Sequence, residues 1–271
     1  MTYALLDSGG EKKLERFGKY TLIRPAPQAV WPPKKASLWE AATGQFERQG
    51  DTKWWGETLP PSWEVAFHAL KLKLALTDFG HVGLFPEHAY HWKWMESTLK
   101  RPAHILHLFA YTGATTLALA RCGHRVCHLD ASQKTVAWAR ENAQLSHLEQ
   151  APIRWIVDDA LRFVRREQKR GVRYDAIVLD PPSFGRGNRG QVFKIEKDLF
   201  VLLTLCAAVL AEKAAFVLLT AHTPGFTPIV LKELLARTLP AGKVTAGEMW
   251  LEAKEEGLLP SGAFARWQPD E

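Results

Sequence analysis

Short apolar runs and longer amphipathic segments alternate along the chain between residues 105 and 239. Five runs have the length and composition of buried strands: residues 105–109, 125–129, 153–157, 174–179 and 214–220. The other segments have helical spacing: residues 114–122, 132–145, 160–170, 192–211 and 228–239. Two further β-prone segments follow, at 243–253 and 262–267. Strands that alternate with helices predict an α/β fold, a Rossmann-like and mostly parallel sheet with helices on both faces.

The first 60 residues have a different composition and lack long helical patterns. Prolines cluster there, and five of the eleven tryptophans lie between Trp31 and Trp63. Strands are predicted at 20–23 and 71–76, a strand running into a turn at 81–88, and a helix at 89–100. The tryptophans favour packing of a domain poor in aliphatic side chains over base stacking, which is the alternative. We expect two domains: residues 1–87, small, β-rich and tryptophan-rich, and residues 88–271, the α/β domain.

The segment from Ile105 to Asp130 has the order of a nucleoside-binding unit. A buried strand leads into the turn Tyr111-Thr112-Gly113, a helix follows and stops at Gly123, and the next strand ends on Asp130. In such units the turn passes close to the ligand, and the acid accepts hydrogen bonds from both ribose hydroxyls. The alternative is an ordinary strand–helix–strand unit with a chance terminal aspartate.

The composition of this turn indicates which nucleoside it would bind. Dinucleotide sites usually carry three glycines, because bare backbone must approach a pyrophosphate. Here the turn reads FAYTGAT with one glycine, and Tyr111 and the threonines would crowd a pyrophosphate. A cofactor that carries a sulfonium and no phosphate fits better, which favours S-adenosyl-L-methionine.

Acidic residues follow several predicted strands at the point where each strand ends. Asp130, the pair Asp158-Asp159 and Asp180 occupy such positions, as does the turn after residue 109. Ligands of parallel sheets bind outside the carboxyl ends of the strands, so we expect these residues to share one site.

Asp180 opens the run DPPSFG, which has features of a substrate loop. Two prolines hold the backbone extended, and Phe184 can stack on a flat substrate. The acid or its carbonyl can accept hydrogen bonds from an amine or a base edge, and the basic loop 185–190 can contact phosphates. The alternative is a strand-terminating turn followed by a solvated basic loop.

Together these motifs resemble those of class I S-adenosylmethionine-dependent methyltransferases. The resemblance covers about residues 78–225 and lies in the runs GLFPEH, FAYTG, HLDAS, ARENAQ, VDDALRFV and LDPPSFGRG. More narrowly, the chain resembles the bacterial group that includes the 23S ribosomal RNA guanine and cytosine methyltransferases. This resemblance implies a methyltransferase sheet in residues 88–271 and S-adenosyl-L-methionine as cofactor.

The resemblance also implies roles for individual residues. The turn would lie along the methionine moiety, Asp130 would take the ribose hydroxyls, Asp159 or its neighbour Asp158 would meet the adenine, and Phe85 and Glu87 would close the pocket. The implied cofactor-binding residues are Phe85, Glu87, Phe109, Ala110, Tyr111, Thr112, Gly113, Asp130, Ala131, Ser132, Asp158, Asp159, Ala160 and Asp180. The implied catalytic residues, beside the methyl group, are Asp180, Pro181, Pro182 and Phe184.

The substrate loop contains no cysteine, and this limits which atom of a base the protein can methylate. Methylation of cytosine at C5 needs a cysteine nucleophile, and neither the DPPSF loop nor the segment 217–222 contains one. Cys206 lies in the middle of a predicted helix, and His222 is expected to end a strand rather than to orient a substrate. Direct attack by a ring or exocyclic nitrogen remains, which needs mainly alignment and charge placement.

Charge and composition bear on partners and compartment. The net charge of +6 favours an anionic partner, and with the resemblance it predicts RNA, specifically ribosomal RNA, as substrate. A small-molecule or protein substrate is the alternative, and a nicotinamide-dependent oxidoreductase or a non-catalytic nucleoside-binding module is a remote alternative.

There is no apolar signal core and no membrane-spanning run, so we expect a cytoplasmic protein. Its three cysteines are expected to be reduced and buried, and no metal is expected.

Overall fold

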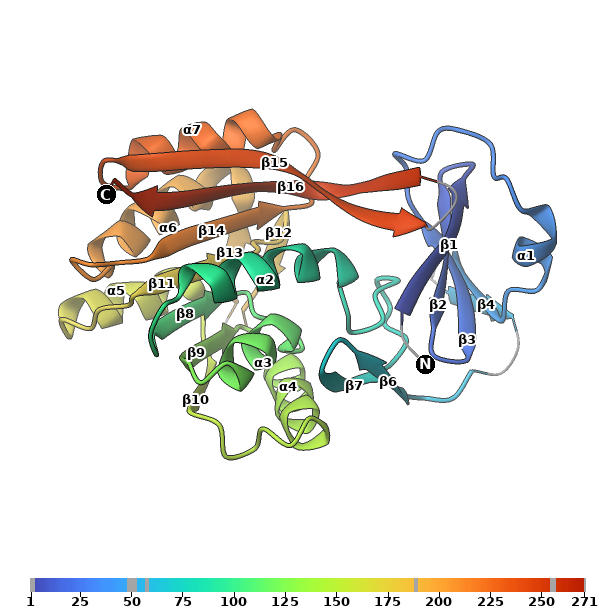
Figure 1. The fold of residues 1–271 in the computed structure, drawn as a ribbon, viewed down its shortest axis with the longest axis horizontal. Helices are drawn as coiled ribbons and strands as arrows, with labels where there is room; N and C mark the ends of the chain where they lie inside the picture. The colour runs from blue at the N-terminus through green and yellow to red at the C-terminus, as the bar shows by residue number, and fades with distance from the viewer. Residues whose placement is uncertain (1–2, 48–52, 57–58, 188–189, 254–256, 271) are drawn as a thin grey trace. The chain divides into compact units, whose positions relative to one another are not determined.

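The computed structural model describes residues 3–47, 53–56, 59–187, 190–253 and 257–270. The chain forms two compact units, which Figure 1 shows as a ribbon. The first unit runs to Glu87 and also includes Trp250–Ser261, and the second consists of His88–Met249 and the residues from Gly262 onward.

The segment 250–261 therefore differs from the predicted domain division, which placed all of 88–271 in the second domain. Leu251, Ala253 and Leu259 form a buried cluster with residues of the first unit, Leu5 and Ala26 among them. The two closing strands are long enough to belong to both units, and their apolar residues at 251–259 are buried in the first one.

A seven-stranded sheet organises the second unit, in the spatial order β10-β9-β8-β11-β14-β16-β15. The strands are β8 His104–Leu108, β9 Arg125–Asp130, β10 Ile153–Val157, β11 Ala176–Leu179, β14 Phe216–Ala221, β15 Gly242–Ala253 and β16 Gly257–Pro269. The pairs from β10 to β14 are parallel, and β16 runs antiparallel to β14. The chain order reverses between β8 and β11, which is where open α/β sheets bind their ligands.

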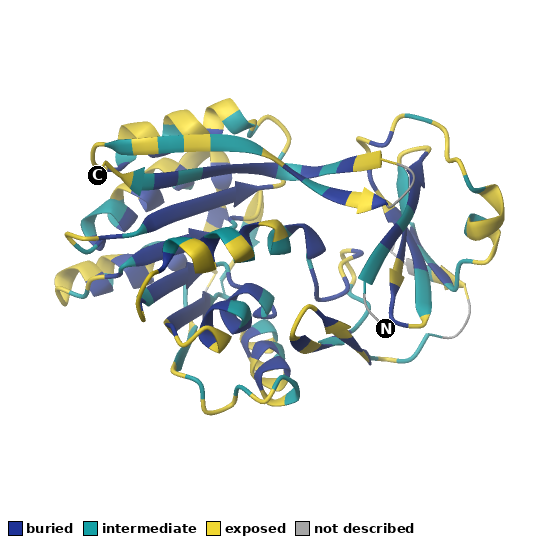
Figure 2. Ribbon diagram, in the orientation of Figure 1, coloured by how far each residue is buried: buried dark blue, intermediate teal, exposed yellow. Residues whose placement is uncertain are grey.

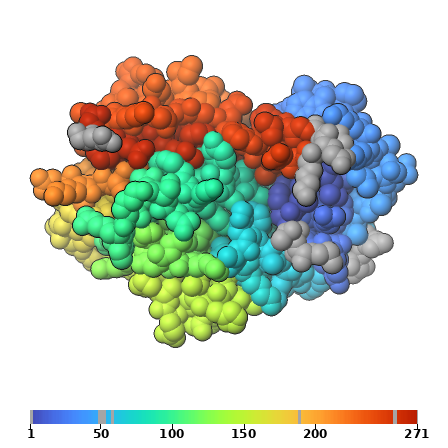
Figure 3. All heavy atoms as spheres, viewed as in Figure 1, coloured from blue at the N-terminus to red at the C-terminus, as the bar shows by residue number. Residues whose placement is uncertain are grey.

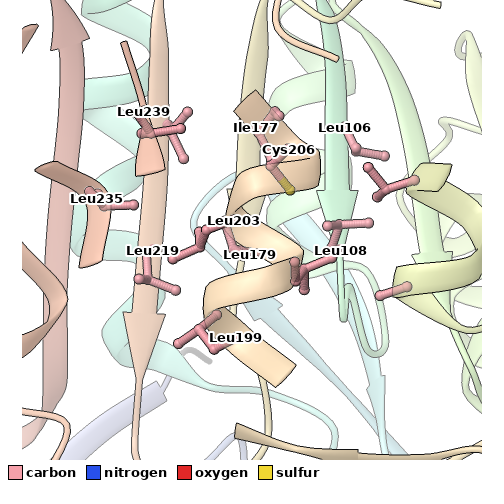
Figure 4. Close-up of a cluster of buried hydrophobic side chains, with 14 of the residues drawn as sticks. Leu106, Leu108, Ile177, Leu179, Leu199, Leu203, Cys206, Leu219, Leu235 and Leu239 are labelled. Atoms are coloured by element: carbon pink, nitrogen blue, oxygen red, sulfur yellow. The ribbon is translucent and has the colours of Figure 1, made fainter. Parts of the chain in front are cut away.

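Helices cover both faces of this sheet, which confirms the predicted fold class. They are α2 Ala89–Thr98, α3 Ala114–Arg121, α4 Gln133–Leu145, α5 Ala160–Lys169, α6 Ile195–Ala208 and α7 Pro228–Thr238. Successive residues of a strand point to opposite faces. Accordingly Ile105 packs in a cluster with Met95 of α2, whereas Leu106 packs in the cluster of Leu203 from α6 and Leu235 from α7 (Figure 4).

The burial pattern follows from these two layers of helices. Strands β11 and β14 are buried along their whole length, while the outer sides of the helices are exposed (Figure 2). On the face drawn with all atoms in Figure 3, helix α2 forms part of the surface of the second unit. No helix in the described ranges combines the length and the apolar character that crossing a bilayer requires.

The first unit is β-rich, as predicted. Strands β1 Tyr3–Gly9, β2 Lys12–Phe17, β3 Tyr20–Pro25, β4 Gly44–Glu47 and β5 Lys53–Gly56 form one sheet in that order. Strands β6 Trp63–Phe67 and β7 Leu70–Leu74 form a separate antiparallel hairpin, and α1 spans Ala36–Glu40.

The tryptophans of this unit mostly serve its own packing. The indole N–H groups of Trp31, Trp39 and Trp54 donate to the Ser8 carbonyl, the Asp7 carboxylate and the Thr77 carbonyl, at 2.9, 2.7 and 3.0 Å. The side chain of Trp63 is buried, and that of Trp55 is 58% exposed. Four of the five residues thus fit the packing interpretation.

Three local predictions were wrong. Residues 192–194 form a strand, β13 Val192–Lys194, paired with β12 Phe184–Arg186, because Phe193 alone of the three is buried and the pattern has the period of a strand. Residues 81–85 form no strand, since Gly83 turns the backbone at φ 94°, and the short helix η1 Pro86–His88 follows. Cys122 is exposed, because it follows the last turn of α3.

Candidate functional site

Strand register places the predicted site residues at one edge of the second unit's sheet. Leu108 of β8 pairs with Leu129 of β9 on one side and with Leu179 of β11 on the other. The next residue along each strand therefore lies at the same level, which aligns Phe109, Asp130 and Asp180. Val157, the last residue of β10, pairs with Asp130, so that Asp158 and Asp159 follow one step further out.

The turn after β8 has an unusual backbone. Phe109, Tyr111 and Gly113 have φ angles of 55°, 50° and 88°, in the left-handed region that costs energy for residues with a side chain. A Cβ atom added to Gly113 would lie 3.0 Å from the Cβ of Ala139 in α4, so this position requires glycine for space as well as for conformation. Such strain persists only where the surroundings hold it.

Asp130 is one of the groups that hold the turn. Its Oδ2 accepts a hydrogen bond from the Tyr111 N–H at 3.0 Å, and its Oδ1 accepts one from the Ser132 N–H at 2.9 Å. Burial raises the pKa of Asp130, and the backbone amides of Ser132, Tyr111 and Ala131 oppose that rise. Each carboxylate oxygen has further lone-pair capacity, which ribose hydroxyls can use.

Asn142 of helix α4 holds the same turn from the other side. Its side chain is fully buried, and its Nδ2 donates to the carbonyl of Thr112 at 2.9 Å. Beneath the turn, the Thr116 hydroxyl lies 2.7 Å from Nδ1 of His107 and 2.9 Å from Nδ1 of His128, which links α3 to β8 and β9. Burial lowers the pKa of His107 to about 3, so its imidazole is neutral.

Sequence reasoning did not identify these supporting residues. In the sequence, Asn142 stands out only as part of the run ARENAQ, and the two histidines are part of apolar runs. A signal was available for Asn142, since a polar residue in register with the sheet-facing Val136 and Ala139 must satisfy its hydrogen bonds inside the protein.

The ends of β9 and β10 border a hollow of about 220 Å³. Its lining residues are Ala131, Val157, Asp158, Asp159, Arg162, Arg166 and Gln191. The two predicted acids differ in their partners. Asp159 caps helix α5, because its Oδ1 accepts from the Arg162 N–H at 2.9 Å, whereas Oδ2 of Asp158 forms an ion pair with Arg166 at 2.5 Å. Ala160, the third residue predicted here, is the buried first residue of that helix.

Asp180 follows β11, on the other side of β8 from Asp130. Its Oδ1 accepts from the Thr220 hydroxyl at 2.7 Å, and its Oδ2 lies 3.4 Å from Nε2 of His88 and 3.8 Å from Nε2 of His222. Burial opposes ionisation of Asp180, but the histidines and Thr220 hold the pKa of its carboxyl below the usual value. His222 follows the last residue of β14, as predicted, and its Nε2 also lies near Asp180, a contact that sequence reasoning did not anticipate.

The loop after Asp180 is anchored at its base and open further along. Pro181 is buried, the Ser183 hydroxyl lies 2.7 Å from that of Thr223, and Phe184 is 51% exposed at the start of β12. The predicted flexible basic loop is in part the β12–β13 hairpin, and its residues 188–189 lie outside the described ranges. Phe193 of this hairpin packs against Phe109 of the turn, with ring centroids 5.0 Å apart.

Two of the residues predicted to contact the cofactor, Phe85 and Glu87, belong to the first unit, and both make contacts within that unit. Glu87 is buried, and its Oε1 accepts from the Ser261 hydroxyl at 3.0 Å. Phe85 packs against His81, with ring centroids 5.0 Å apart. Their role toward a cofactor stays a prediction.

A mostly parallel sheet whose strand order reverses beside β8, with a strained turn after that strand and acids after its neighbours, is the architecture of a Rossmann-like protein. Comparison with known protein families identifies the family to which this Rossmann-like protein belongs. The S-adenosylmethionine-dependent methyltransferase family matches residues 39–248, and the chain belongs to this family. S-adenosyl-L-methionine is its cofactor and methyl transfer its reaction.

Similar proteins agree with this assignment. A crystal structure of a methyltransferase dependent on the same cofactor, from Agrobacterium tumefaciens, is 38% identical, with a TM-score of 0.93 over 99% of this chain and 90% of that one. A structure from Streptococcus mutans at 17% identity, with a TM-score of 0.76 over 98% of this chain and 74% of that one, shows the shared fold.

Curated relatives are longer proteins. One from Marinobacter nauticus, called ribosomal RNA large subunit methyltransferase K/L, is 29% identical over 242 residues, which are 87% of this chain and 31% of that protein. A relative of the same name from Stutzerimonas stutzeri is 33% identical over 64% of this chain and 22% of that protein. The chain thus spans less than a third of either relative.

Asn142→Ala tests whether the turn needs its second support. The variant leaves the Thr112 carbonyl buried without this donor, so we expect a loss of about 1–3 kcal/mol in the free energy of unfolding and weaker cofactor binding. Urea denaturation and calorimetry with S-adenosyl-L-methionine measure the two effects. Gln144→Ala, at an exposed position of the same helix, is the control. Unchanged stability and affinity in the Asn142 variant would contradict this role.

Proposed function

We propose that this methyltransferase acts on a base of ribosomal RNA and transfers the methyl group to a nitrogen by direct attack. The Marinobacter and Stutzerimonas relatives carry the name of ribosomal RNA methyltransferases, and the net charge of +6 suits a polyanionic substrate. Cytoplasmic location is part of the proposal, and the three free cysteines fit a reducing compartment.

The alignment of strand ends is the observation that carries the proposed site. In spatial order, β10 ends just before Asp158, β9 ends at Asp130, β8 leads into the turn and β11 ends just before Asp180. Adenine, ribose and methionine follow one another in the cofactor in the same way. The adenine would occupy the hollow at Asp158 and Asp159, the ribose hydroxyls would bind Asp130, and the methionine moiety would lie along the turn.

This order directs the methyl group toward β11 and the substrate loop. Phe184 is exposed there and offers an aromatic face on which a base can stack. The loop prolines limit the conformations of the backbone between Asp180 and Phe184, so that the pocket is formed before the substrate arrives. The negative charge of Asp180 lies where positive charge develops on an attacking nitrogen, which stabilises the transition state.

The cysteines argue for direct attack rather than a covalent intermediate. Burial raises the pKa of Cys206, in the middle of α6, to about 12, and that of Cys127, within β9, to about 11. A buried thiol with so high a pKa is a poor nucleophile at neutral pH. Cys122 lies at the end of α3 and follows no strand of the site edge.

Asp130→Ala should abolish cofactor binding at micromolar concentrations. Two ribose hydroxyls lose a charged acceptor, at about 1.5–3 kcal/mol for each hydrogen bond, and the turn loses its Tyr111 contact. Calorimetry with S-adenosyl-L-methionine measures the loss. Asp270→Ala removes an exposed acid and serves as control. Wild-type affinity in the Asp130 variant would refute the placement of the ribose.

Asp180→Ala should separate binding from turnover. Asp180 lies on the substrate side of the turn, so we expect the affinity for S-adenosyl-L-methionine to stay close to that of the wild type. The rate of methyl transfer should fall by about 100-fold or more, as when an electrostatic group is removed from an active site. Transfer of a radioactive methyl group to total ribosomal RNA measures the rate. A normal rate would contradict the assignment of the substrate loop.

The RNA substrate is tested by salt dependence and by mass spectrometry. Filter binding to ribosomal RNA fragments should weaken steeply as salt rises, because cationic side chains displace counterions from phosphates. Ribosomal RNA from cells that lack the protein should lack one methylated base. Affinity that does not respond to salt, together with an unchanged pattern of methylation, would instead favour a small-molecule or protein substrate.

A further inference from the structure

Three side chains that are distant in the sequence converge beside the substrate loop. They are His88 at the start of α2, Asp180 after β11 and His222 after β14. The two Nε2 atoms lie 3.3 Å apart, and they lie 3.4 and 3.8 Å from Oδ2 of Asp180. The imidazole rings are nearly parallel, with an interplanar angle of 11°.

The three atoms occupy the corners of a nearly equilateral triangle. The two Nε2 atoms face each other at hydrogen-bond distance, so one N–H can bridge them, and a cation would take the place of that proton with both lone pairs turned toward Asp180. A point equidistant from the three atoms lies about 2 Å from each, which is the bond length of zinc to imidazole nitrogen and to carboxylate oxygen. The spacing is thus that of three ligands around one cation.

We propose that His88, Asp180 and His222 bind one divalent transition-metal cation of the zinc class. Two imidazoles and one carboxylate suit zinc and its neighbours, whereas magnesium and calcium prefer sites made only of oxygen. The Thr220 hydroxyl supports the site, because its bond to Oδ1 orients Asp180 with Oδ2 toward the histidines. The three side chains are 15%, 19% and 33% exposed, which leaves a path for the cation to enter.

The position of this site suggests its use. Three protein ligands leave a fourth coordination position, as in catalytic zinc sites. Because Asp180 is both a ligand and the first residue of the substrate loop, that position would accept water or an oxygen of the substrate and leave the lone pair of the attacking nitrogen free. This use rests on the proposed function, whereas binding of the cation rests on the geometry of the three side chains alone.

Metal titration tests the site without any assay of methyl transfer. The full chain, prepared without a polyhistidine tag and stripped with a chelator, is titrated with Co²⁺ and with Zn²⁺. We expect one Zn²⁺ per chain by elemental analysis and a visible absorption spectrum of four-coordinate Co²⁺ that Zn²⁺ abolishes. Millimolar Mg²⁺ should not compete. No bound Zn²⁺ at micromolar concentrations, or displacement by Mg²⁺, would overturn the proposal.

Variants assign the binding to these three residues. His88→Ala and His222→Ala should each weaken Zn²⁺ binding by more than about tenfold, since even supporting residues of metal sites have effects of that size. Asp180→Asn, which retains the shape of the side chain and an acceptor for Thr220, should do the same without loss of folding. His147→Asn removes an exposed imidazole outside the cluster and should bind like the wild type. Equal Zn²⁺ binding in the double variant His88→Ala/His222→Ala would refute the site.

The result of the Zn²⁺-binding experiments can be distinguished from the result of the tests of the proposed function. Loss of Zn²⁺ binding in the ligand variants supports the site even if ribosomal RNA is not the substrate. Failure to bind Zn²⁺, in a protein that still methylates ribosomal RNA, removes the cation site and leaves the proposed function intact.

Discussion

The carboxylate of Asp130 holds the turn on which the proposed nucleoside site depends. It joins the end of β9 to the turn after β8 through the Tyr111 amide, and to the start of α4 through the Ser132 amide. The turn contains two residues with side chains in the left-handed region, which a free peptide rarely adopts. The Asn142 amide on the Thr112 carbonyl and the close approach of Gly113 to Ala139 complete the support. Neighbouring elements therefore hold this turn in its left-handed conformation.

The parallel register distributes the chemistry of the site along one edge of the sheet. Neighbouring strands lie about 4.8 Å apart, so the acids after β10, β9 and β11 are spread over a length comparable to that of a nucleoside with its methionine tail. The order of the strands gives each acid a different task. Asp158 and Asp159 border the hollow, Asp130 holds the turn, and Asp180 faces the two histidines. The same unit, a parallel strand followed by an acid, is thus repeated along the sheet edge, yet the acids at the two ends of this edge have different surroundings.

The polar groups around this edge are arranged so that each charge has partners. The pKa of Asp180 lies below its usual value despite burial, because two imidazoles and a hydroxyl face its carboxylate. Burial lowers the pKa of His107 to about 3 and holds the pKa of His128 well below its usual value, so both histidines under the turn are neutral, and the Nδ1 atom of each contacts the Thr116 hydroxyl. A protonated imidazole beneath the turn would repel a cationic cofactor, whereas a neutral imidazole packs and forms hydrogen bonds there without adding positive charge.

The sequence alone determined the α/β class, the strands along the proposed site and the acids that follow them. The reason is that strands and their ends are predicted by the local pattern of hydrophobic and polar residues. The sequence did not determine the β12–β13 hairpin, where pairing of residues 192–194 with β12 and burial of Phe193 against Phe109 accompany a strand in place of the predicted start of a helix. It also did not bring His88 and His222 to Asp180. Those three residues are separated by up to 134 positions and meet only because β11 and β14 are neighbours in the sheet and α2 begins beside their ends. Contacts of that range leave no local pattern, so the tertiary structure alone decided them.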